Sequence, residues 1–73
     1  MSQVDYFVSM MIHTIRVIQG EQGWASLQEI ETLITEVDAD FPFHVLKSTS
    51  FHFERRVDLN GITYLREKKN YNF

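Results

Sequence analysis

Residues 50–69 read SFHFERRVDLNGITYLREKK, and this stretch decides the predicted fold. Asn60-Gly61 is typical of a two-residue hairpin turn, because both central positions of such a turn need a positive φ angle. A two-residue loop places Leu59 opposite Ile62, and side chains then alternate between the two faces of the hairpin. A hairpin with one strongly apolar face is not stable alone in water. We therefore expect the preceding residues to form helices that cover that face.

This register divides the hairpin into two faces of different character. The residues expected on the covered, apolar face are Phe51, Phe53, Val57, Leu59, Ile62 and Tyr64. The residues expected on the solvent face are His52, Glu54, Arg56, Asp58, Thr63 and Glu67. In the same register Arg55 lies opposite Arg66, where like charges repel each other. We expect either a phosphate or an acid of this chain between them, and the candidate acids are Glu36, Asp38 and Asp40.

The first predicted helix runs from about Gln3 to Gln19, between the N-cap Ser2 and the stop signal Gly20. One apolar stripe at helical spacing consists of Val4, Val8, Met11, Ile15 and Ile18. A second stripe consists of Tyr6, Met10 and Val17, with His13 between them. The second stripe has two interpretations. Either the helix is central and buried on several sides, or this stripe contacts a protein partner or a second copy of the chain.

Two further helices are predicted before the hairpin. Ser26 and Glu29 form a capping box that starts a helix over residues 27–37. Its apolar face consists of Leu27, Ile30, Ile34 and Val37, with Leu33 beside them. Trp24 precedes this cap and is predicted to be a core residue rather than a stacking platform for bases. Pro42 suits the first turn of a short third helix over residues 41–49.

The short third helix is expected to bury two apolar side chains and to present polar ones to solvent. The buried pair is Phe43 and Leu46, and the exposed residues are His44, Lys47 and Ser48. Residues 70–73 follow the hairpin and are predicted to be a frayed tail.

Length and composition indicate one folded domain over residues 1–73, with 44% hydrophobic and 14% aromatic residues. The chain contains no cysteine, which excludes disulfide bonds and thiolate metal sites and fits a cytoplasmic protein. The charge-free run over residues 6–15 is too short for a membrane span, which needs about 20 apolar residues. Asp5 lies where a signal peptide carries positive charge. We therefore expect no membrane association.

Charge is divided unevenly along the chain. Residues 1–43 contain seven acids and one base, whereas residues 44–73 contain six bases and three acids. The net charge of −3 argues against tight, non-specific binding of polyanions. The basic C-terminal part leaves room for one positive surface on the hairpin side.

No pattern in the sequence is typical of catalysis or of metal binding. The chain has no glycine-rich phosphate loop and no nucleophile elbow, and its three histidines fall on three different predicted elements. Asp38, Asp40 and His44 lie close in sequence, but their spacing matches no zinc or calcium loop. We therefore predict neither an enzyme nor a protein with a bound metal or cofactor.

The predicted order of two helices, a short helix and a two-stranded hairpin resembles a winged helix-turn-helix domain from Val4 to Lys69. The expected fold class is therefore α+β, with three helices and a C-terminal hairpin wing. A narrower resemblance is to the LOTUS (OST-HTH) family of small winged-helix modules. The residues that carry it are Gly23-Trp24, Leu27, Ile30 and Asp38-Ala39-Asp40-Phe41. The chain departs from that family between Phe41 and Phe51, where it lacks the family's glycine-containing stretch.

The resemblance implies a nucleic-acid reader, or a protein contact through the same fold. The first hypothesis is a small regulator that binds DNA or RNA through the short helix and the hairpin. Its contact residues would be His44, Lys47, Ser48, Arg55, Arg56, Arg66 and Lys68. The second hypothesis is a non-enzymatic protein-interaction module that dimerises through the first helix. Its contact residues would be Tyr6, Met10, His13 and Val17.

Overall fold

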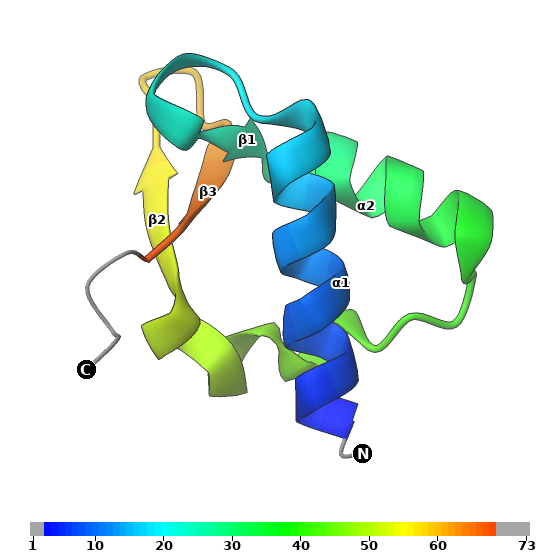
Figure 1. Cartoon of the computed structure of the whole chain (residues 1–73). Coiled ribbons are helices and arrows are strands. Elements are labelled where there is room, and N and C mark those ends of the chain that lie inside the picture. The colour runs from blue at the N-terminus through cyan, green and yellow to red at the C-terminus, as the bar shows by residue number, and fades with distance from the viewer. Residues whose placement is uncertain (1–2, 69–73) are drawn as a thin grey trace.

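A computed structural model describes residues 3–68, and for residues 3 and 47–51 it describes the backbone alone. The tail predicted over residues 70–73 lies outside the described residues. The elements, in chain order, are α1 (Gln3–Ile18), the 3-10 turn η1 (Glu21–Gly23), β1 (Ala25–Ser26), α2 (Leu27–Val37), the 3-10 segment η2 (Phe43–His52), β2 (Phe53–Val57) and β3 (Thr63–Glu67) (Figure 1). The α+β class is therefore confirmed, with two α-helices and a three-stranded antiparallel sheet in the described part.

Helix α1 is the centre of the molecule. It packs against α2, η2 and β3 (Figure 1), which supports the interpretation of a helix buried on several sides. Phe7, Met11 and Ile15 recur every fourth residue and are completely or almost completely buried. They form the core together with Ala25, Ile30, Ile34, Phe41, Val45, Phe53 and Leu65.

Helix α2 begins and ends where local chemistry predicts. The Ser26 hydroxyl accepts a hydrogen bond from the backbone N–H of Glu29 at 3.2 Å, and the helix covers residues 27–37 as expected. Ile30 and Ile34 are buried, whereas Val37, expected on the same face, is 79% exposed. Val37 is the last helical residue, and it extends past the end of the core.

The expected third helix is not α-helical. Residues 43–52 form 3-10 turns, and the N–H of Val45 bonds to the carbonyl oxygen of Pro42 at 3.0 Å, three residues back. The segment contains several residues with low α-helix propensity, among them Val45 and the Ser-Thr-Ser run over residues 48–50. Phe43 and Leu46, expected to be buried, are half-buried against the core.

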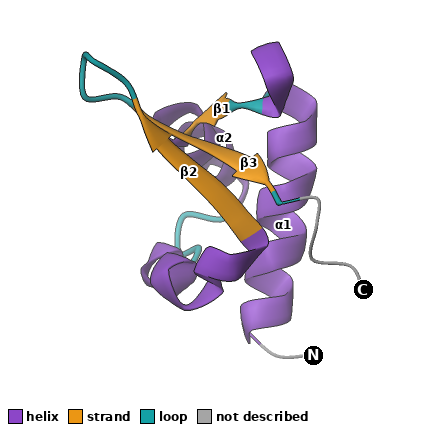
Figure 2. Cartoon of the chain, turned by 90° about the vertical axis from the view of Figure 1, so that its left-hand side faces the viewer, coloured by secondary structure: helices purple, strands orange, loops and turns teal. Residues whose placement is uncertain are grey.

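The sheet has one more strand than the sequence predicts. Its order is β1-β3-β2, and Ala25 and Ser26 of β1 pair with Leu65 and Tyr64 of β3. Figure 2 shows the three strands in front of α2, with α1 beside them. The two-residue strand β1 leads directly into α2 and so joins the start of that helix to the hairpin.

The hairpin turn differs from the predicted two-residue loop. The N–H of Asp58 bonds to the carbonyl oxygen of Ile62, and the N–H of Gly61 bonds to the carbonyl oxygen of Asp58, both at 3.0 Å. The loop therefore contains Leu59, Asn60 and Gly61, and only Gly61 has a positive φ, of 82°. The Asp58 carboxylate accepts the N–H groups of Asn60 and Ile62 at 2.8 and 3.0 Å, which favours this three-residue loop.

The longer loop moves the register by one residue. Glu54 lies opposite Arg66, Arg55 lies opposite Leu65, and the predicted Arg55–Arg66 pairing is wrong. Because the side-chain period of a strand is two, the shift changes the face of every residue on one strand relative to the other. Tyr64, expected on the covered face, lies on the solvent face.

The covered face of the sheet is shorter than expected. Phe53 and Leu65 are buried, at 5% and 2% exposure. Three apolar residues that were also expected there are exposed, because the end of the hairpin projects beyond the helices (Figure 2). They are Val57, Leu59 and Ile62.

An ion pair fastens the sheet to α1. The Arg16 guanidinium donates to both carboxylate oxygens of Glu67, from Nη2 at 3.0 Å and from Nε at 3.1 Å. This contact depends on the observed register, which turns Glu67 toward the helices instead of toward solvent. Within residues 3–68, no helix combines the length and hydrophobicity needed to cross a bilayer.

Candidate binding surface on the C-terminal hairpin

Two adjacent arginines of β2 lie on opposite faces of the hairpin. Successive side chains of a strand alternate, so Arg55 shares a face with Phe53 and Leu65, while Arg56 lies on the solvent face. Both side chains are exposed. Among the residues that the structure describes, neither guanidinium has an ion pair. The strand therefore presents positive charge on both of its sides.

The solvent face of the sheet carries a cluster of aromatic rings and guanidinium groups. We call it the outer cluster, and its members are Trp24, Glu54, Arg56, Tyr64 and Arg66. The guanidinium carbon of Arg56 lies 4.8 Å from the Trp24 ring centre and 5.0 Å from that of Tyr64. The guanidinium carbon of Arg66 lies 4.3 Å from the Trp24 ring centre. These are cation–π distances, so both arginines contact aromatic rings of the sheet's solvent face.

Within the outer cluster, Arg66 is neutralised by its own chain. Its Nε donates to Glu54 Oε1 at 2.6 Å, its Nη2 lies 2.5 Å from the same oxygen, and its Nη1 donates to the carbonyl oxygen of Gln22 at 3.1 Å. Gly23 leaves room for this side chain, because a Cβ there would lie 3.3 Å from the Arg66 Cδ. The prediction of a partner acid is confirmed for Arg66, but the acid is Glu54 and not Glu36, Asp38 or Asp40.

Trp24 is not the core residue that the sequence predicts. It is half-buried under the two arginines, while its neighbour Ala25 is in the core. Trp24 immediately precedes β1 and has extended backbone angles, so its side chain points to the opposite side from that of Ala25. The position of Trp24 could have been predicted from the sequence only if a strand had been recognised at residues 25–26.

The remaining predicted contact residues are not all placed by the structure. His44 is exposed on η2, as expected. The side chains of Lys47 and Ser48 lie outside the described residues. Lys68 is half-buried, and its N–H donates to the carbonyl oxygen of His52 at 3.0 Å.

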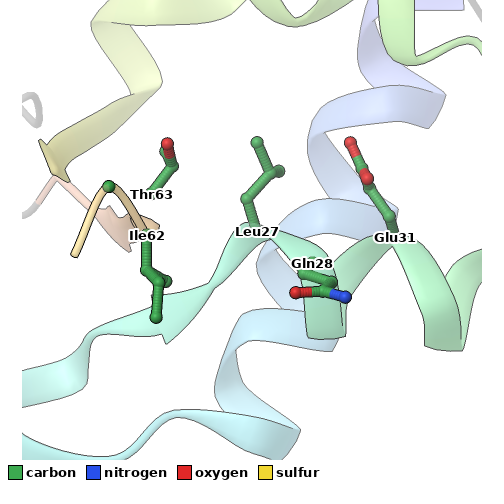
Figure 3. Close-up of a pocket in the computed structure, with 6 residues that line it drawn as sticks. Leu27, Gln28, Glu31, Ile62 and Thr63 are labelled. Atoms are coloured by element: carbon green, nitrogen blue, oxygen red, sulfur yellow. The ribbon is translucent and has the colours of Figure 1, made fainter.

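An open groove that the sequence did not predict separates the hairpin tip from α2. Its volume is about 270 Å³. Leu27, Gln28 and Glu31 line the α2 side, and Gly61, Ile62 and Thr63 line the hairpin side (Figure 3). Leu27 and Ile62 supply apolar surface, and Glu31 is the single charged side chain in the lining. This lining offers apolar contact and one negative charge.

The surface of α1 that was predicted to meet a partner is partly used within the fold. The Tyr6 hydroxyl donates to Asp38 Oδ2 at 2.7 Å, and its ring packs edge-on against Phe41 at 5.5 Å. This hydrogen bond, together with weaker effects of desolvation and of the carboxylate charge, raises the pKa of Tyr6 above its ordinary value of 10.0. Met10 packs against the core. His13 and Val17 are exposed.

Across residues 3–68, no three side chains of the kinds that ligate metals come together. Asp38 accepts hydrogen bonds from the Tyr6 hydroxyl and from the backbone N–H of Asp40, and so its carboxylate stabilises the turn that follows α2.

We compared the chain with protein-family models, with curated proteins and with solved structures, and none of them matches it.

Proposed function

We propose that this chain is a small winged-helix-like regulator that binds DNA or RNA. The order α1–β1–α2–η2–β2–β3 supports the winged-helix assignment, with η2 in the place of the third helix and the hairpin as the wing. The observation that carries the function is the exposed pair Arg55 and Arg56, which gives the wing a guanidinium on each side. We place this regulator in the cytoplasm, in keeping with a chain that has no cysteine.

A wing with this charge pattern suits the phosphate backbone rather than the bases. Guanidinium groups bind phosphate oxygens with two parallel hydrogen bonds, and phosphate contacts position a protein without reading sequence. His44 on η2, with Lys47 and Ser48, would complete the contact beside the wing. Arg66 is removed from the proposed contacts, because Glu54 and Gln22 already occupy all of its donor nitrogens. The net charge of −3 makes the binding local to the wing and weak elsewhere.

The test is the salt dependence of binding to duplex DNA, duplex RNA and single strands. Each neutralised phosphate contributes about 0.9 to the slope of log K against log salt on a duplex. We expect Arg55→Gln with Arg56→Gln to lower that slope by about two. The matched control is Gln28→Glu with Thr32→Glu on α2, which changes the net charge equally. Equal losses in both variants, or no binding at low salt, would contradict the proposal.

A second function, protein binding by the same fold, is favoured by the exposed apolar hairpin tip. Val57, Leu59 and Ile62 are each more than 40% exposed. On α1, Val17 is 65% exposed, and it lies one turn from His13. These two places are where a dimer of the chain would form. Sedimentation over a wide concentration range, with Val17→Ser and Leu59→Ser as separate variants, assigns the contact. A monomer at every concentration excludes the dimer.

A further inference from the structure

The free edge of β2 presents unpaired backbone groups in a defined pattern. The strand order β1-β3-β2 puts β2 at the margin of the sheet, and within residues 3–68 no strand pairs with its other edge (Figures 1 and 2). Hydrogen bonds to β3 occur at both ends of β2, at His52–Lys68 and at Asp58–Ile62. Because bonded pairs alternate along an antiparallel ladder, the even-numbered residues of β2 face β3. The N–H and C=O groups of Phe53, Arg55 and Val57 therefore point to the open edge.

An exposed edge strand is a template for another extended segment, and natural proteins protect such edges with charge, proline or bulges. Of these devices, β2 has only charge, at Glu54, Arg55 and Arg56, and it contains no proline. Glu54 is already paired with Arg66, and Arg56 is already stacked on Trp24 and Tyr64. Of the two exposed arginines of β2, only Arg55 shares a face with Phe53 and Val57, whose backbone groups also point outward.

A second copy of β2 is a poor occupant for this edge. Two copies of β2 can pair antiparallel through the outward N–H and C=O groups, with the centre of the pairing at any of the three middle residues of the strand. The three resulting registers place Glu54, Arg55 or Arg56, respectively, opposite the same residue of the other copy. Like charges directly opposite each other destabilise a ladder.

Two of these registers bring Glu54 opposite Glu54 or Arg56 opposite Arg56 without an opposite-charge pair beside them. In the third register Arg55 faces Arg55, while Glu54 and Arg56 face each other on the other side of the ladder. A strand of different sequence that carries an acid opposite Arg55 turns that remaining repulsion into an attraction, so it suits this edge better than a second copy.

We propose that the edge of β2 binds an extended, acidic segment of another protein by strand addition. The segment carries Asp or Glu opposite Arg55 and apolar side chains opposite Phe53 and Val57, since these three residues share one face. Its backbone would pair with the outward N–H and C=O groups of the same three residues. The inference rests on the protein-binding function proposed above, but not on dimer formation.

The experiment uses the full chain and the peptide acetyl-Thr-Val-Thr-Glu-Thr-Val-Thr-amide. Amide hydrogen exchange by NMR should slow at Phe53, Arg55 and Val57 by roughly tenfold at saturation. Exchange should change little at Glu54 and Arg56, whose N–H groups already bond to β3. Replacing the central Glu of the peptide by Lys should weaken binding roughly fivefold.

Charge exchange identifies the contact. Arg55→Glu should reverse the preference, so that the Lys peptide binds more tightly than the Glu peptide. The matched control is Arg56→Glu, an equal charge change on the opposite face, which should keep the original preference.

Slower exchange that spreads equally over odd-numbered and even-numbered residues of β2 would refute strand addition. A peptide preference that Arg56→Glu reverses as Arg55→Glu does would also refute it. If amide exchange at the edge slows as the protein concentration rises in the absence of peptide, the edge binds a second copy of the chain, and the proposal is overturned. Loss of peptide binding on Leu59→Ser, with unchanged exchange at the edge, would leave protein binding in place at the hairpin tip but refute this site.

Discussion

Glu54 and Arg66 lie directly opposite each other on β2 and β3, and their side chains form an ion pair on the solvent face of the sheet. The register predicted from Asn60-Gly61 would have placed Arg55 there instead, with two positive charges facing each other. In the observed register, electrostatics and turn geometry agree: Arg66 has an acid opposite it, and Arg55 faces the apolar Leu65. Asp58, at the start of the loop, sets this register.

The first prediction concerns which residue controls the turn. Asp58→Ala removes an acceptor of two backbone N–H groups and should destabilise the protein by about 1–2 kcal/mol. Asn60→Ala should cost less than about 0.5 kcal/mol, because Asn60 does not have a positive φ angle. Urea unfolding measures both free energies. A larger loss for Asn60→Ala would mean that the two-residue turn exists in solution.

The second prediction compares two leucines of the hairpin. Leu65 is 2% exposed between β1 and β2, whereas Leu59 is fully exposed in the loop. Leu65→Ala should lower the free energy of unfolding by about 2–5 kcal/mol, because it leaves a cavity in the core. Leu59→Ala should change it by less than about 0.5 kcal/mol. Similar losses at both positions would place the tip of the hairpin against the helices.

The third prediction is an energetic coupling within the outer cluster. A double-mutant cycle of Trp24→Ala with Arg56→Ala should give an interaction energy of about 0.5–1 kcal/mol, because the guanidinium lies over the indole ring. The same cycle with Arg55→Ala should give none, since Arg55 projects from the other face of the strand. Thermal or urea unfolding followed by circular dichroism supplies the four free energies of each cycle. Coupling of equal size in both cycles would indicate a general charge effect.

The fourth prediction follows from the raised pKa of Tyr6. The hydrogen bond to Asp38 favours the neutral phenol in the folded state. Its contribution to stability is therefore complete below the unfolded-state pKa of about 10 and is lost as the pH rises through the higher folded-state pKa. The difference between the ultraviolet titrations of the parent protein and Tyr6→Phe isolates this group. Asp38→Asn should move the midpoint back toward the ordinary value, and an unchanged midpoint would contradict the assignment.

The two helices and the existence of the hairpin were predictable because local signals define them. The Ser26–Glu29 cap and the spacing of Ile30 and Ile34 act within a few residues of each other, and α2 has the predicted range. The core position of Phe53 was also predicted correctly. Of the candidate contacts, His44, Arg55 and Arg56 are exposed as expected.

Other features depend on residues far apart in the chain. Strand β1 exists because Ala25 and Ser26 meet Leu65 and Tyr64, and two residues carry no periodicity from which to predict a strand. The position of Trp24 under two arginines follows from that pairing. The predicted two-residue loop is wrong for a local reason. The Asp58 carboxylate accepts two backbone N–H groups of the three-residue loop, and this outweighs the preference of Asn-Gly for a two-residue turn.

The sequence alone establishes an α+β domain with helices near residues 3–19 and 27–37, a hairpin and a basic C-terminal part, because capping, periodicity and turn residues act over short distances. The third helix, predicted over residues 41–49, is replaced by a 3-10 segment over residues 43–52. The tertiary structure decided which charges remain available. Pairing across the sheet joined Arg66 to Glu54 and stacked Arg56 on Trp24 and Tyr64, and it left Arg55 exposed beside the open edge of β2. Strand register sets these partners, and a shift of one residue exchanges every one of them.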